Sequence, residues 1–300
     1  MIVDMNMKRL IILILIVLII YLVINVSKEP MTLPSNILIV DEKAIVNALQ
    51  HTSYLNDLNA SDIKTRKLPS DSNTLIEHYV KHMITPSPFQ KKMLDDMIKT
   101  IYIELKVTDR KAFIRETWKF AIFYGIENNF PHTHKDIIFM PTGLIHMERN
   151  NRMTLIHEKV HIHQKRIPLL YEDLYTNYWH FKRIDNSFLD KLPFKLRSNP
   201  DVLDNNWLFT YNGANIVMLV KYRSSSMSIT DVDYIGYNID TGEYKALKDI
   251  PQYTEFFGKF NINYYHPYEI VADMIAYHCY GMVRPTKSYN RFLSWWKKIE

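Results

Sequence analysis

A segment without Gly or Pro from residue 152 to 166 carries two histidines four residues apart, and this spacing constrains the fold more than any other feature. Its centre reads HEKVH, from His157 to His161, with Leu, Ile and Val among the neighbouring residues. These properties predict a helix over 152–166 with a buried side. At 3.6 residues per turn, both histidines project from one face of that helix. The fold must therefore place two imidazoles side by side.

The residue types in HEKVH indicate a metal site. Two imidazole nitrogens on one helical face can bind one zinc ion. Glu158 is badly placed to be a third ligand, but it can accept a proton from a water at the metal. With 12 His among 300 residues, the pattern arises by chance with a probability of roughly a few per cent. Surface positions on an ordinary amphipathic helix are therefore the alternative for His157 and Glu158.

A catalytic zinc site needs a third protein ligand and leaves the fourth position to water. One group of zincins places a further His six residues after the second histidine and a Gly three residues after it. Here those positions are Ile167 and Gln164. That group is excluded, so the third ligand has to come from another segment.

A second predicted helix, 267–280, offers the missing ligand. Pro267 stands at its start, a position that favours a helix N-terminus. Glu269 and Asp273 are four residues apart and share one face, so Glu269 can bind the metal while Asp273 accepts a hydrogen bond from an imidazole. A solvated helix face is the alternative for this pair. Glu269 follows His161 by 108 positions, which predicts a long insertion between the two helices.

The pattern HEKVH followed by a distant ExxxD resembles the gluzincin branch of the zincin-like metallopeptidases, the group that includes thermolysin-like enzymes. The match is local and covers about 131–164 and 267–280. It implies an α+β zincin-like domain that binds one Zn²⁺ and hydrolyses a peptide or protein substrate. By the same resemblance the zinc ligands are His157, His161 and Glu269, the general base is Glu158, and the outer residue that orients an imidazole is Asp273.

A short apolar run that ends at Pro141 precedes the first metal helix and predicts a strand. In zincins an edge strand at this place lines the cleft and pairs with an extended substrate backbone. Residues 131–134 are expected to form a polar loop, with a second metal site or a substrate contact as the alternatives. By resemblance, the edge-strand role falls to Asp136, Ile137, Ile138, Phe139 and Met140.

No motif identifies the residues that would stabilise an oxyanion. Tyr264 and Tyr265, just before the second metal helix, are candidates to donate a hydrogen bond to it, with packing as the alternative. His266 is a candidate substrate contact beside them. Arg197 is a candidate contact for an oxyanion or a substrate carboxylate, with a structural arginine as the alternative. If Glu269 is not the third ligand, the reserves are His266, which is nearest, His180 and His278.

The N-terminal sequence predicts a membrane anchor. From residue 10 to 24 every residue is apolar except one Tyr, and the run extends to Val26, so insertion into a bilayer is favourable. A helix over 10–26 reaches about 26 Å, the short end for a spanning helix. A cleaved signal peptide is the alternative. We expect an uncleaved signal-anchor over 1–26 that contacts lipid through 10–26, a juxtamembrane linker over 27–35, and an extracytoplasmic or lumenal catalytic domain over 36–300.

Inside the predicted domain, helical patterns come first and hairpin patterns follow. The inserted region, about 171–260, continues after a turn-rich stretch at 197–201 with short alternating runs separated by pairs such as Asn212-Gly213, a signature of β-hairpins. Residues 57–73 are expected to be a loop. The predicted strands are 36–40, 207–211, 216–222, 234–239 and 243–246, and the further helices are 42–49, 74–83, 88–105, 110–124 and 171–188.

Composition limits the remaining functions. Hydrophobic residues make up 47% of the chain, which is ample for a packed core. The net charge of +5 is modest and the basic residues are scattered, so no nucleic-acid partner is expected. Three functions stay open. The sequence favours a zinc metallopeptidase over an inactive zincin-like binding or structural protein and over a zinc hydrolase of a non-peptide substrate.

Overall fold

The structure, a computed structural model, describes residues 36–105, 112–145, 149–202, 204–224, 226–282 and 285–298. These residues all belong to one compact unit, 36–300. The predicted anchor over 1–26 and the predicted linker over 27–35 lie outside the described residues. Within the described ranges, no helix is both long and apolar enough to cross a bilayer.

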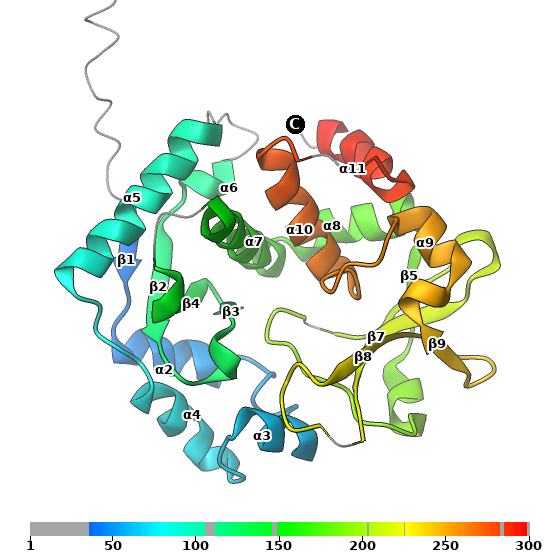
Figure 1. Cartoon of the computed structure of the whole chain (residues 1–300), viewed down its shortest axis with the longest axis horizontal. Coiled ribbons are helices and arrows are strands. Elements are labelled where there is room, and N and C mark those ends of the chain that lie inside the picture. The colour runs from blue at the N-terminus through cyan, green and yellow to red at the C-terminus, as the bar shows by residue number, and fades with distance from the viewer. Residues whose placement is uncertain are drawn as a thin grey trace, which may run out of the picture. The chain divides into compact units, whose positions relative to one another are not determined.

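A four-stranded mixed sheet with helices on both faces forms the N-terminal part of this unit (Figure 1). Its strands are β1 (Ile37–Ile39), β2 (Trp118–Phe123), β3 (His132–His134) and β4 (Ile137–Pro141). Their order is β1-β2-β4-β3, in which β1, β2 and β4 are parallel and β3 is antiparallel to β4. The described residues therefore mix α and β structure, consistent with the α+β class.

The helices on the two faces of the sheet are α2 (Glu42–Gln50) and α4 (Ser72–Lys81) on one side, and α5 (Pro88–Leu105) and α7 (Arg149–Arg166) on the other. Alternate strand residues point to opposite faces, so β2 contributes to two cores. Phe120 and Ile122 belong to the cluster of α5 and α7, whereas Ala121 and Phe123 belong to the cluster of α2 and α4. Cover on both faces explains why β2 and β4 are almost continuously apolar.

The predicted helix over 110–124 is wrong. In its described part the segment forms a single turn, α6 (Ala112–Arg115), and then the strand β2. The sequence of β2, WKFAIF, is rich in aromatic residues, which favour strands. A short apolar run buried on both faces cannot be distinguished from a buried helix by its periodicity.

The predicted loop over 57–73 is wrong in its middle, where α3 (Ala60–Arg66) forms. The side chain of Asn59 accepts hydrogen bonds from the backbone N–H groups of Ser61 and Asp62, and the carboxylate of Asp62 accepts one from the N–H of Asn59. This reciprocal arrangement is a capping box. The residue pair that forms it, Asn followed three positions later by Asp, was readable in the sequence.

The strand expected at 136–140 exists as β4, but it is not an edge strand. It bonds to β2 on one side and to β3 on the other, so the edge lies at β3. The polar loop expected at 131–134 is therefore also wrong. Lys135 adopts a left-handed conformation with φ 53°, and this tight reversal folds β3 back onto β4. The edge-strand role consequently fails for Asp136, Ile137, Ile138, Phe139 and Met140.

The predicted insertion connects α7 to α10 (Pro267–Cys279). It contains a five-stranded antiparallel sheet in the order β5-β6-β7-β8-β9. The central strands β7 (Ile216–Tyr222) and β8 (Val232–Asn238) pair along their whole length, which confirms the predicted small antiparallel sheet. One face of β7 joins the main core and the other a separate cluster. The outer strands are β5 (Phe181–Arg183), β6 (Trp207–Phe209) and β9 (Tyr244–Ala246).

The helix predicted over 171–188 is only partly right. Helix α8 (Pro168–Asp173) continues into a π-helical turn, Leu174–Tyr178. His180 then takes a left-handed conformation with φ 59°, which ends the helix before β5. The remaining elements are α9 (Pro251–Phe257), α11 (Lys287–Lys298), and 3₁₀ turns at Glu127–Asn129, Thr142–Leu144, Asn186–Lys191, Tyr211–Gly213 and Leu247–Asp249.

Helices α7 and α10 pack against each other at the centre of the unit (Figure 1). Both were predicted, to within three residues at either end. Every residue of α10 from Pro267 to Ala276 is buried. A helix that is covered on all sides needs no polar face, which explains its apolar sequence. The two acids that it does carry, Glu269 and Asp273, therefore require partners inside the protein.

A buried charge cluster ties α3 to the segment after β2. Arg66 donates to Asp62 at 2.5 Å and to Glu127 at 2.8 Å, and Tyr54 donates to Glu127 at 2.7 Å. Tyr79 donates to the same carboxylate. Glu127 begins a run of three non-glycine residues with φ between 47° and 57°, a conformation that costs about 1–2 kcal/mol per residue. The hydrogen bonds to Glu127 hold this turn in place.

Substitution of Arg66 by Met should lower the free energy of unfolding by about 3–5 kcal/mol, because it leaves two buried carboxylates without their cation. Urea denaturation followed by circular dichroism measures the change. The control is Lys92→Met, which removes the cation of the exposed pair with Asp96 and should have little effect. Equal midpoints for the two variants would contradict a stabilising role for the buried cluster.

Stability should also depend on pH through Glu127. Burial raises the pKa of this carboxyl, but the Arg66 guanidinium, with further help from Tyr79 and Tyr54, holds it below its ordinary value of 4.5. A carboxyl with a lowered pKa stabilises the fold above its unfolded pKa, and that contribution is lost as the pH falls through the folded value. Glu127→Gln should therefore flatten the loss of stability below about pH 4.5. Parallel pH profiles of wild type and variant would refute this.

Candidate metal centre

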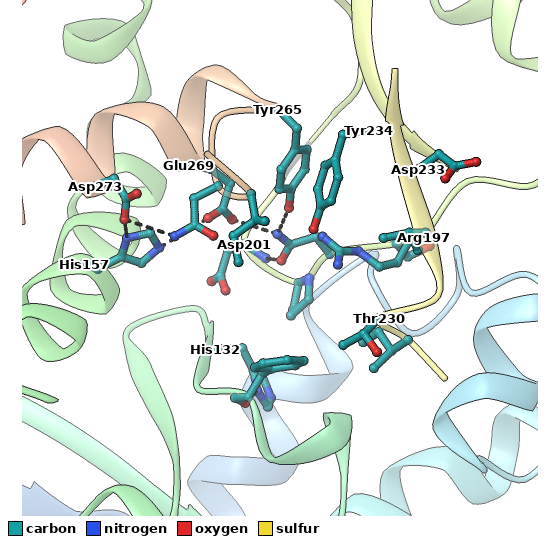
Figure 2. Close-up of a pocket in the computed structure, with 18 of the residues that line it drawn as sticks. His132, His157, Arg197, Asp201, Thr230, Asp233, Tyr234, Tyr265, Glu269 and Asp273 are labelled. Atoms are coloured by element: carbon teal, nitrogen blue, oxygen red, sulfur yellow. Dashed lines mark hydrogen bonds and ion pairs between the residues drawn. The ribbon is translucent and has the colours of Figure 1, made fainter. Parts of the chain in front are cut away.

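Three side chains from two helices meet at one point. His157 and His161 come from α7 and Glu269 from α10, and Figure 2 shows Glu269 and His157 reaching toward each other from their helices. The two Nε2 atoms lie 2.9 Å apart. Glu269 Oε2 is 3.3 Å from Nε2 of His157, and its Oε1 is 3.7 Å from Nε2 of His161. Among the described residues this is the one group of three or more His, Cys, Asp or Glu whose ligand atoms converge.

The spacing of these atoms fits a zinc ion. Tetrahedral bonds of 2.0–2.2 Å to nitrogen and oxygen place neighbouring ligand atoms about 3.3 Å apart. The three distances of 2.9, 3.3 and 3.7 Å lie around that value. Two histidines and one glutamate are also a donor set of catalytic zinc sites, in which the fourth position is open. The geometry and the donor types therefore agree.

The proton of His157 is fixed by an acid on the second helix. Its Nδ1 lies 3.0 Å from Asp273 Oδ1, so Nδ1 carries the hydrogen and Nε2 presents a lone pair to the cluster. Asn263 and Asn261 donate to the same carboxylate at 3.1 and 3.3 Å. Burial lowers the pKa of His157, but its contacts with Asp273 and Glu269 outweigh this and raise it well above the ordinary value.

The proton of His161 is fixed by an amide on its own helix. Its Nδ1 lies 2.8 Å from Gln164 Oε1. The Gln164 amide nitrogen donates to the carbonyl of Tyr268 and to the hydroxyl of Tyr175, each at 3.0 Å. A carbonyl can only accept, so this contact sets the amide orientation and makes His161 Nδ1 the donor. The Nε2 atom of His161 therefore also presents a lone pair.

Two lone pairs and a carboxylate consequently face one another in a buried space. Such a group of acceptors is unfavourable unless a cation lies between them. A proton satisfies two of the atoms, as the raised pKa of His157 indicates. A metal ion can bind both imidazole nitrogens and the carboxylate at once. The residues present therefore fit a bound divalent ion.

Glu158 lies beside this cluster at the wall of a cavity of about 1060 Å³. Its side chain is buried, and within the described part of the chain its Oε2 has no hydrogen-bond partner. Burial, and then the negative charge of Asp201, raise the pKa of Glu158 well above its ordinary value. Positive charge at the cluster, from His157 or from a bound divalent ion, opposes this shift and favours the carboxylate. With a metal ion present, the unpartnered oxygen is therefore available to exchange a proton.

The turn-rich segment 197–201 supplies part of the site that the sequence pattern did not identify. Asn199 donates to Glu269 Oε1 at 2.7 Å and to the hydroxyl of Tyr265 at 2.5 Å. Asp201 accepts from the backbone N–H of Thr133 at 2.9 Å. The only signal in the sequence was a run of polar residues and Pro, which predicted a turn but not its position beside the metal helices.

Asp201 forms a buried ion pair with Lys165 of α7. Lys165 Nζ lies 3.2 Å from Asp201 Oδ1 and also donates to the carbonyls of Thr133 and Pro200. Although burial opposes it, the ammonium of Lys165 holds the pKa of Asp201 below its ordinary value. This contact joins α7, β3 and the segment 197–201 at one point.

Of the two tyrosines predicted as oxyanion donors, the structure brings only Tyr265 to the cluster, and Arg197, the predicted arginine contact, lines the same cavity. Tyr264 instead lines a separate small cavity, and its carbonyl accepts from Tyr253. His266 caps α10: its Nδ1 accepts from the N–H of Tyr268, and its Nε2 donates to the carbonyl of Asp204 at 2.7 Å. The substrate and oxyanion roles of Tyr264 and His266 are therefore not supported.

The reserve ligands also lie elsewhere. His180 packs against Tyr211 and Phe256, and His278 contacts Tyr289 at 2.9 Å. His266 is already committed to the cap of α10. Among the described residues Glu269 therefore remains the candidate third ligand.

Of the 131–134 segment, His132 lines the large cavity, and Figure 2 shows it across from Glu269.

Comparisons of the chain with protein-family models, with curated proteins and with solved structures found no match. The assignment of this site therefore depends on its geometry and chemistry.

Purified wild-type protein should contain close to one zinc per chain, and Glu269→Ala should contain much less, because two imidazoles alone form an incomplete site. Asp273→Ala should weaken zinc binding about 10- to 100-fold, since it frees the ring that the acid orients. Elemental analysis and competition with a chelator measure these changes. The control is Glu255→Ala on α9, outside the site. Equal zinc contents in wild type and Glu269→Ala would exclude Glu269 as a ligand.

Proposed function

We propose that this protein is a membrane-anchored zinc metallopeptidase of the gluzincin type. The observation that carries the proposal is the pair of imidazole lone pairs of His157 and His161, fixed from outside by Asp273 and Gln164 and completed by Glu269. The position of α7 and α10 beside a mixed sheet supports a zincin-like fold. The apolar run over 10–26 supports the anchor and a catalytic domain outside the cytoplasm or in a lumen.

The proposed reaction is the hydrolysis of a peptide bond in the large cavity. When bound, zinc would lower the pKa of a water molecule and polarise the substrate carbonyl. Glu158 accepts the proton of the attacking water through its unpartnered oxygen and passes it to the leaving amine. Its burial beside the cavity keeps that carboxylate away from bulk water during the transfer.

Tyr265 is the proposed donor to the developing oxyanion. Its hydroxyl accepts a hydrogen bond from Asn199, so its own O–H remains available to donate toward the cavity. Asn199 also holds Glu269. One amide therefore positions both a metal ligand and the oxyanion donor. Burial raises the pKa of Tyr265 well above its ordinary value, which keeps the phenol protonated at neutral pH.

Substitution of Glu158 by Gln should preserve the zinc content and reduce peptide turnover about 10²- to 10⁴-fold, because the amide cannot accept the proton. Fluorogenic peptide libraries and elemental analysis of the same preparation test both parts. The control is Glu77→Gln, an exposed glutamate of α4. Full turnover by zinc-loaded Glu158→Gln would refute the base assignment.

If the zinc-loaded wild type cleaves no peptide, peptidase activity is refuted. A search with carbohydrate and lipid esters would then separate a non-peptide hydrolase from a binding protein that keeps only the scaffold.

A further inference from the structure

Arg197 stands at the wall of the cavity next to the proposed catalytic residues. Its backbone N–H donates to Val220 of β7 at 2.9 Å. Its guanidinium carbon lies 5.4 Å from the ring centre of Tyr265 and 5.9 Å from that of Tyr234, and Figure 2 shows the three side chains together. Stacking on aromatic rings holds a guanidinium in one orientation without using its N–H donors.

Within the part of the chain that the structure describes, Arg197 has no acidic partner. Among the described residues, five other arginines form ion pairs with carboxylates, whereas Arg197 forms none within 4.0 Å. Its guanidinium lies over the ring of Tyr265. Arg197 interacts electrostatically with the carboxylate of Glu269, whose charge the proposed metal ion would take up. A half-buried guanidinium with unused donors at a cavity wall is suited to bind an anion from the ligand.

The part of the cavity wall next to Arg197, formed by residues between 221 and 248, is also positively charged. Between residues 221 and 248, four cations and one acid line the cavity. The acid, Asp233, is shared by Lys221 at 3.1 Å and Arg223 at 2.9 Å, and Lys245 and Lys248 complete the set. With Arg197, this wall carries a net positive charge of four. Such a wall raises the local concentration of anionic ligands.

Arg197 is also close to the metal ligands. It lies over the ring of Tyr265, the Tyr265 hydroxyl accepts from Asn199, and Asn199 also donates to Glu269. Two side chains thus separate the guanidinium from a metal ligand. Because one extended residue spans about 3.3–3.6 Å, a carboxylate on Arg197 would belong to a residue within about one or two positions of the cleaved bond.

We propose that Arg197 binds a carboxylate of the substrate, so that the enzyme prefers peptides with an acidic group one or two residues from the cleaved bond. The inference rests on the proposed peptidase function and adds the substrate class. The carboxylate can belong to a Glu or Asp side chain or to the C-terminus of the peptide. Both sources present the two oxygens that a guanidinium binds in parallel.

The test uses the full-length, zinc-loaded protein and matched fluorogenic peptides. One set differs only by Glu or Gln at each position near the bond, and a second differs only by a free or an amidated C-terminus. The proposal expects kcat/KM to be about tenfold or more higher for the acidic member of one set. A preference in the first set identifies a side-chain carboxylate, and one in the second set identifies the C-terminus.

The variants assign the preference to Arg197. Arg197→Met should bring the ratio of acidic to neutral kcat/KM close to one, and Arg197→Lys should retain part of it, because lysine keeps the charge but loses the planar fork. The control is Arg183→Met, which removes an arginine stacked on Trp207 outside the cavity and should keep the wild-type ratio. Zinc content and thermal melting confirm that each variant is folded.

The kinetic results distinguish a failure of the carboxylate preference from a failure of the peptidase function. A wild-type ratio near one with efficient cleavage of neutral peptides overturns the carboxylate preference and leaves the peptidase function standing. A high ratio that persists in Arg197→Met overturns the assignment to Arg197. No cleavage of any peptide by the zinc-loaded wild type overturns the peptidase function, and the substrate class falls with it.

Discussion

The lone pairs of two imidazoles that face each other across 2.9 Å are the constraint on which the site depends. Neutral imidazoles avoid this arrangement unless each ring is forced to carry its hydrogen on the far nitrogen. Asp273 imposes this on His157, and Gln164 imposes it on His161. Both outer partners lie on α7 and α10, the helices that carry the candidate ligands. The pairing of α7 with α10 therefore determines the chemistry as well as the packing.

The long insertion has a second task besides building a wall of the cavity. Its segment 197–201 returns to the metal helices and supplies Asn199, which holds Glu269, and Asp201, which holds Lys165. Without Asn199, the Glu269 oxygen nearest to His161 would lose its hydrogen bond in a buried place. The insertion between α7 and α10 thus supplies the polar side chains that Glu269 and Lys165 need as hydrogen-bond partners and that the two helices do not provide.

The sequence predicted the parts of this structure that depend on local pattern. Helix α7 follows from the absence of Gly and Pro and from the spacing of His157 and His161, and the antiparallel sheet follows from short strand-like runs with turn residues such as Asn212-Gly213 between β6 and β7. It could not predict which side of β4 would be covered, because that depends on the reversal at Lys135. Nor could it separate Tyr264 from Tyr265, since adjacent side chains diverge and only the fold decides which one reaches the cavity.

The segment 197–201 also joins the candidate metal site to the buried charge cluster of α3. Ser198 donates to Asp62 through its backbone at 3.1 Å and through its hydroxyl at 2.7 Å, and its carbonyl accepts from Arg66. Asn199 follows directly in the chain. The strained turn at Glu127 is held by the same arginine. The hydrogen bonds of Ser198 to α3 therefore anchor the backbone from which Arg197 and Asn199 extend. A loss of order at α3 would be transmitted through Asn199 to Glu269, the candidate metal ligand.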